Sequence, residues 1–138
     1  MLSFDGNTAP YLINAYVRIK SIFRKANAQT GSEGEGLAQR VGAAPALIVA
    51  DSAERALSLK LLQYASVIES VVQSLEPHRL CTFLYELASL FHQFYERCPV
   101  LTAPDAATRD ARLALCNLVA NTLKHGLDLL GIQVIEQM

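Results

Sequence analysis

The feature that most constrains the fold is a run of apolar residues between Pro77 and Pro99 that recurs at spacings of three and four. Such spacing places the side chains on one face of an α-helix, which has about 3.6 residues per turn. The stripe consists of Leu80, Leu84, Leu87, Phe91, Phe94 and Cys98. Pro77 suits a first helical turn, and Pro99 cannot continue the helix. The pattern therefore predicts an amphipathic helix that ends at Pro99.

Two further segments show long helical periodicity. One extends from about Ala9 to Ala28 and combines an apolar stripe with a basic flank. The other extends from about Ala107 to Leu130, and Gly131 is well placed to end it because glycine favours the left-handed conformation at a helix C-terminus. We expect a long helix near each end of the chain.

A helical pattern also begins at Asp51. Glu54 follows three residues later, which resembles a capping box with Asp in place of the usual Ser or Thr. The expected apolar stripe consists of Leu57, Leu61, Tyr64, Ile68, Val71 and Leu75. Residues 63–66 can interrupt this pattern, so either one long helix or two short helices fit it.

The remaining segments indicate loops rather than a sheet. Residues 29–36 combine Gly, Ser and Thr with two glutamates and predict a surface loop, and residues 47–49 are a candidate for a short extended piece. No segment combines sustained alternation of apolar and polar residues with hairpin turns. We therefore predict an all-α fold, a helical bundle of four to five main helices.

Composition limits the class of protein. A length of 138 residues with 51% hydrophobic residues fits one soluble globular domain. The apolar stretches are far shorter than the roughly 20 residues that a membrane-spanning helix needs. Twelve basic and 13 acidic residues give a net charge of -1, so any contact with nucleic acid must be local.

Cysteine and histidine spacing argues against a metal site. The three cysteines form no CxxC pair, and their odd number excludes a fully paired set of intrachain disulfides, which fits a reducing cytoplasm. The three histidines have no Cys or carboxylate at metal-ligand spacing. No nucleophile is paired with a base at a credible spacing, which makes a free-standing enzyme the weakest interpretation.

Four segments carry a resemblance to a known family. Residues 80–98, LCTFLYELASLFHQFYERC, and residues 125–138, HGLDLLGIQVIEQM, resemble the C-terminal region of bacterial arginyl-tRNA synthetases. Residues 3–22 are similar to that family's junction between the catalytic and anticodon-binding domains. Residues 110–113, Asp-Ala-Arg-Leu, are close to the pattern that names the DALR anticodon-binding domain, although DALR places leucine before arginine.

This resemblance implies a tRNA-recognition module. Residues 1–138 would be the anticodon-binding domain, and residues 1–8 would form the junction to a missing N-terminal catalytic domain. Family members are class I synthetases that ligate arginine to its tRNA with ATP and Mg in a catalytic domain carrying a HIGH motif. Neither HIGH nor a KMSK-like sequence is present here. We therefore expect no catalysis and no cofactor in this fragment. The expected location is the cytoplasm. The expected partners are arginine tRNA and the enzyme's own catalytic domain, and no membrane is expected to be involved.

Tyr95 and His92 are the first candidate RNA contacts. They lie three residues apart on a stripe rotated about 100° from the core stripe of the helix, so they should border the core and face outward in part. An exposed tyrosine can stack on an unpaired base. The family resemblance implies that Tyr95, in the HxFY motif, lines the anticodon pocket. The alternative is that Tyr95 only packs at the helix edge.

Met138 is the second kind of candidate. The resemblance implies that a C-terminal methionine folds back into the anticodon pocket. Arginine anticodons carry cytosine in the middle position, and its N4 amine is a donor that a carboxylate or carbonyl near Met138 can accept. Without the resemblance, a frayed terminus is the expected state of this residue.

Five cations are candidate phosphate contacts. They are Arg18, Arg24, Lys25, Arg97 and Arg112. Together they can form a local basic surface for tRNA phosphates. Ordinary solvated charge is the competing account. For the chain as a whole, the rival function is a helical protein-interaction module with no nucleic-acid role.

Overall fold

Five helices make up the part of the chain that the computed structural model describes, namely residues 8–30, 51–103 and 105–133. They are α1 (Thr8–Thr30), α3 (Ser52–Leu62), α4 (Tyr64–Ser74), α5 (His78–Arg97) and α6 (Ala106–Leu129). No strand occurs within these ranges. The predicted all-α fold is confirmed. The extended piece expected at 47–49 and most of the predicted loop lie outside the described residues, and α1 continues two residues beyond the expected end.

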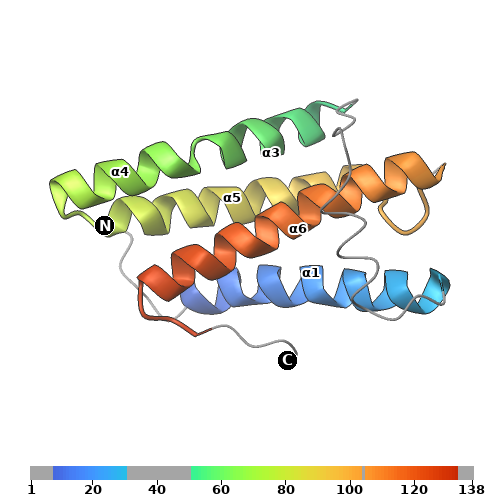
Figure 1. Ribbon diagram of the computed structural model, residues 1–138, viewed down its shortest axis with the longest axis horizontal. Coiled ribbons are helices and arrows are strands. Elements are labelled where there is room, and N and C mark those ends of the chain that lie inside the picture. The colour runs from blue at the N-terminus through green and yellow to red at the C-terminus, as the bar shows by residue number, and fades with distance from the viewer. Residues whose placement is uncertain (1–7, 31–50, 104, 134–138) are drawn as a thin grey trace.

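The helices form an elongated bundle with α5 and α6 in its middle (Figure 1). Helix α1 packs against both central helices on one side, and α3 packs against both on the other. Figure 1 also shows that α1 and α5 run in the same direction, while the α3–α4 rod and α6 run in the opposite one. Because α1 and α5 are parallel, successive turns of α1 lie beside successive turns of α5.

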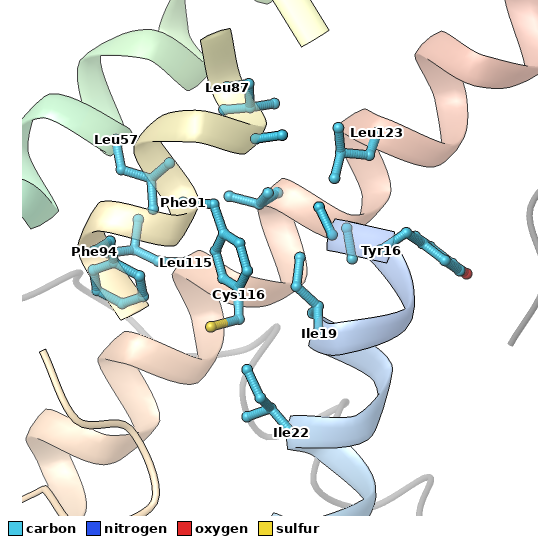
Figure 2. Packing of buried hydrophobic residues seen from close by; sticks show 14 of the residues in the cluster. Tyr16, Ile19, Ile22, Leu57, Leu87, Phe91, Phe94, Leu115, Cys116 and Leu123 are labelled. Carbon is cyan, nitrogen blue, oxygen red and sulfur yellow. The ribbon is translucent and has the colours of Figure 1, made fainter. Parts of the chain in front are cut away.

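The predicted stripe of α5 forms the centre of the core. All six of its residues are buried, and Phe91 and Phe94 have no exposed surface. Figure 2 shows Phe91 lying between Leu115 and Cys116 of α6 and the side chains of α1, with Ile19 among them. Burying one large apolar side chain stabilises a fold by about 1.5–3 kcal/mol. This stripe therefore fixes which face of α5 is turned inward and which is left for the surface.

The segment after Asp51 forms two helices, which is the second of the two expected alternatives. The break lies at Gln63, and no residue of α4 is fully buried. The expectation that Leu75 continues the apolar stripe is wrong. Leu75 adopts the left-handed conformation that ends α4, with φ of 55°, and is 84% exposed. That turn carries its side chain off the helical face that contacts α5.

Helix ends follow the expected chemistry in part. The Asp51 side chain accepts a hydrogen bond from the backbone N–H of Ala53 at 2.8 Å, which caps α3. Asp105 does the same for α6 through the backbone N–H of Thr108 at 2.7 Å. Gly131 has φ of 79° just beyond α6, as predicted for the residue that ends this helix.

Candidate functional site

A polar stripe runs along the outer face of α1. Its members Asn14, Arg18, Ser21 and Lys25 follow one another at helical spacings. The adjoining face supplies Ala15, Ile19 and Ile22 to the core. Because this buried face fixes the rotation of α1, the polar stripe lies at its border, on the side where Tyr95 of α5 is found.

This stripe lines an open hollow with a volume of about 590 Å³. Its cationic walls come from Arg18, Arg24 and Lys25, and Tyr95 of α5 provides an aromatic wall. We call this the basic hollow. None of the described residues that line it is acidic. Three cations and an aromatic ring around one hollow form a site suited to an anionic ligand that carries a planar group.

The structure thus brings together four of the eight residues singled out from the sequence, and His92 adjoins them. The Arg18 guanidinium lies 5.9 Å from the centre of the Tyr95 ring, and its Nη1 lies 3.4 Å from Nδ1 of His92. Both Tyr95 and His92 are half-buried, as expected for residues that border the core. Burial, with the Arg18 charge second, lowers the pKa of His92, while Glu96 opposes this shift.

Tyr95 also lines a second, smaller hollow. Its other walls are the turn after α5, Pro99 to Thr102, and its volume is about 310 Å³. We call this the apolar hollow. The Tyr95 ring stacks on Phe91 with ring centres 6.1 Å apart and an interplanar angle of 29°. Because Phe91 is fully buried, this contact holds the Tyr95 ring at the border between the two hollows.

Arg112 does not reach the basic hollow. Its Nε donates to Oε1 of Glu54 at 3.2 Å, and its Nη1 donates to the carbonyl oxygen of Pro99 at 2.6 Å. Glu54 is only 2% exposed, so this ion pair is buried on one side. Arg112 therefore joins α6 to α3 and to the turn that forms the apolar hollow. Glu54, which the sequence suggested as a member of a capping box, thus also pairs with a residue of a different helix.

Arg97 and Met138 are not part of the described site either. Arg97 lies near the end of α5, 60% exposed, where its Nη2 is 3.5 Å from Oδ2 of Asp51. It does not line the basic hollow. Met138 lies outside the described residues, so its predicted return to the pocket stays a prediction.

Sequence reasoning missed part of the lining. Asn14 and Ser21 line the basic hollow, and they had no assigned role. Their spacing from Arg18, four and three residues, was the available signal, because those intervals put all three on one face of a helix. The turn after α5 was also missed, although it begins at Pro99, only four residues after Tyr95.

The described residues show neither a cluster of metal ligands nor, at Cys98 and Cys116, a thiol that ionises near neutral pH. They contain no group of three metal-ligating side chains. Burial raises the pKa of the Cys98 thiol to about 11 and that of the Cys116 thiol to about 12, so neither supplies a thiolate near neutral pH. None of the described helices is both long and apolar enough to cross a membrane.

Comparison with protein families places the chain in one family. The model of the DALR anticodon binding domain matches residues 12–138. The chain belongs to the DALR anticodon-binding domain family. That membership confirms the resemblance noted in the sequence and does not favour the alternative of a protein-interaction module.

Curated relatives and solved structures agree with the family. The DALR domain is 50% identical over 139 residues to the arginine–tRNA ligase of Cellvibrio japonicus, and it covers 22% of that protein. It resembles the arginyl-tRNA synthetase of Thermus thermophilus with a TM-score of 0.77 and 37% identity, over 99% of this chain and 22% of that one. The enzyme of Plasmodium falciparum gives a TM-score of 0.74 at 30% identity, over 100% of this chain and 22% of that one. The DALR domain thus spans about a fifth of the length of the ligases it matches.

Proposed function

We propose that this domain reads the anticodon loop of an arginine tRNA at the basic and apolar hollows. The observation that carries the proposal is the convergence of Arg18, Arg24 and Lys25 on the ring of Tyr95 in a member of this family. Proteins read single-stranded RNA loops by stacking splayed bases on aromatic rings and by contacting the phosphates with cations. Both elements are available here within one hollow.

The position of Tyr95 supports different roles for the two hollows, one for a base and one for its phosphates. A base stacked on Tyr95 would lie toward the apolar hollow, where the turn after α5 would cover part of its other face. Its phosphates would then lie toward the three cations of α1. Stacking contributes about 1–3 kcal/mol per base, so one such contact is enough to make Tyr95 a principal determinant of binding.

The middle base of the anticodon is the proposed target of specificity. Cytosine at that position presents its N4 amine as a donor. We propose that a carboxylate or carbonyl group near Met138 accepts it, as the family resemblance implies. An acceptor there would favour cytosine over uracil, which presents a carbonyl oxygen in place of the amine.

For the full-length protein we propose ligation of arginine to its tRNA. The relatives are named arginine–tRNA ligases. The family resemblance implies that this reaction uses ATP with Mg²⁺. We propose that ATP and Mg²⁺ are held by another part of the full-length protein, since this sequence lacks a HIGH or KMSK-like motif. Among the described residues there is no group of three metal-ligating side chains. The proposed partners of the domain are therefore arginine tRNA and a catalytic domain, and the proposed location is the cytoplasm.

The proposal is tested with a matched pair of charge variants. Lys25→Ala and Lys124→Ala each remove one exposed lysine, but only Lys25 lines the basic hollow. Binding of an arginine tRNA anticodon stem-loop is titrated at several salt concentrations. Lys25→Ala should weaken binding and make the log–log salt slope less steep by about 0.7, the value for one single-stranded phosphate contact. Lys124→Ala should change neither. Equal effects of the two variants would contradict a phosphate path through the basic hollow.

A further inference from the structure

His92 adjoins the basic hollow without lining it, and its surroundings fix the orientation of its ring. The ring lies between Tyr11 of α1, with centres 5.5 Å apart, and its neighbour Phe91, with centres 5.6 Å apart. Phe91 is fully buried, and Tyr11 packs in turn against Tyr85 at 5.0 Å. These contacts leave Nδ1 of His92 directed at Arg18 of α1, at 3.4 Å.

The contact between His92 and Arg18 has only one chemically possible direction. A guanidinium has donors and no acceptor, so Nδ1 must be the acceptor and the ring must be neutral with its hydrogen on Nε2. The charged and titratable groups around His92 are Arg18 and Tyr11 on α1 and Glu96 on α5. Burial and Arg18 lower the pKa of His92 more than Glu96 raises it, which keeps the ring in this neutral form near neutral pH.

Arg18 needs such a partner because of its position. It shares the basic hollow with Arg24 and Lys25, whose charges repel it, and its side chain is exposed. A long exposed arginine samples many rotamers, and ordering it on binding opposes affinity. A neutral acceptor on α5 can hold the guanidinium beside Tyr95 before RNA arrives.

We propose that His92 is a positioning residue that acts on RNA through Arg18: its Nδ1 accepts a hydrogen bond from the guanidinium and holds it beside the Tyr95 ring. This inference rests on the proposed function, because it concerns the same RNA-binding hollow. It assigns His92 a role other than direct contact with a base or phosphate. Two variants separate these roles: His92→Ala removes the acceptor atom, and His92→Asn keeps an acceptor in its place.

The test is a double-mutant cycle on the 138-residue chain with the arginine anticodon stem-loop. His92→Ala should weaken binding roughly threefold to tenfold, the range expected for one lost hydrogen bond. In an Arg18→Ala background the same change should have no further effect. His92→Asn should restore most of the lost affinity, because its amide oxygen takes the place of Nδ1 as an acceptor. Equal losses in both backgrounds, or an asparagine variant as weak as the alanine variant, would overturn the inference while leaving the proposed function standing.

A measurement on the free chain tests the contact between His92 and Arg18 independently of the proposed RNA binding. Nitrogen NMR of the imidazole in the free chain should show the tautomer protonated at Nε2, and Arg18→Ala should change the Nδ1 resonance. A protonated ring, or one indifferent to Arg18→Ala, overturns the contact itself. If instead Arg18→Ala leaves RNA binding unchanged, the proposed function fails, and the role of His92 in binding fails with it.

Discussion

At the scale of single residues, Arg112 has two interpretations. The sequence suggests a phosphate contact, whereas the structure shows a structural brace, a side chain that joins α6 to α3 and to the turn after α5. Arg112 belongs to the motif closest to the DALR pattern, and its type alone suggested tRNA phosphates. The sequence does not indicate which residue Arg112 pairs with. Glu54 lies 58 positions away on α3, and only the packing of α3 against α6 brings the two together.

The brace makes a prediction for stability. Arg112→Met should lower the free energy of unfolding by about 3–5 kcal/mol, because it removes the cationic partner of the buried Glu54 carboxylate. Urea unfolding of the two proteins measures this difference. The matched control is the double variant Glu54→Gln with Arg112→Met, which also removes the buried negative charge and should recover a large part of the loss. A single variant as stable as the parent chain would contradict the assigned ion pair.

Tyr95 shows how far residue-level reasoning reached. Its position three residues after His92, off the core stripe, predicted a half-exposed ring beside the core, and the structure confirms it. Its role in binding came from the family resemblance and stays a proposal. The spacing of Arg18, Arg24 and Lys25 likewise indicated a basic flank on the first helix. That this flank faces Tyr95 could not be predicted, since it depends on the parallel packing of α1 and α5.

At the scale of elements, periodicity predicted each helix that buries a full stripe. Helices α1, α5 and α6 were expected within a few residues of their observed ends because their apolar faces are covered by the bundle. Helix α4 differs. Its apolar side chains Val67, Ile68 and Val71 are only half-buried, and Val72 is 68% exposed. The same periodic pattern therefore predicted α4 as a helix, but it did not predict that the apolar side chains of α4 would be only half-buried.

This difference predicts unequal local stability. Helix α4 packs mainly against α5, and within the described residues none of its side chains is fully buried, so it should open more easily than the central helices. Hydrogen exchange should show backbone amides of α4 exchanging faster than those of Phe91 and Phe94 in α5 or Leu115 and Cys116 in α6. Equal protection of α4 and the central helices would mean that α4 unfolds only with the whole bundle.

At the scale of the whole molecule, the net charge of -1 and the proposed RNA contact are compatible because the positive charge is local. Among the described residues, ion pairs away from the hollow include Asp51 with Arg97 and Glu76 with Arg79. The described lining of the basic hollow contains no acidic residue. A nearly neutral domain of this kind should select a particular RNA element in preference to any polyanion, since bulk attraction contributes little.

The most direct test of the central claim is a titration of the 138-residue chain with two arginine anticodon stem-loops that differ only in the middle base, cytosine or uracil, at one fixed low salt concentration. The account predicts tighter binding of the cytosine stem-loop, a loss of roughly fivefold to a hundredfold in Tyr95→Ala from the stacked base, and near-normal binding in Tyr95→Phe, which keeps the ring. Equal affinity for the two stem-loops, together with unchanged binding in Tyr95→Ala, would contradict it.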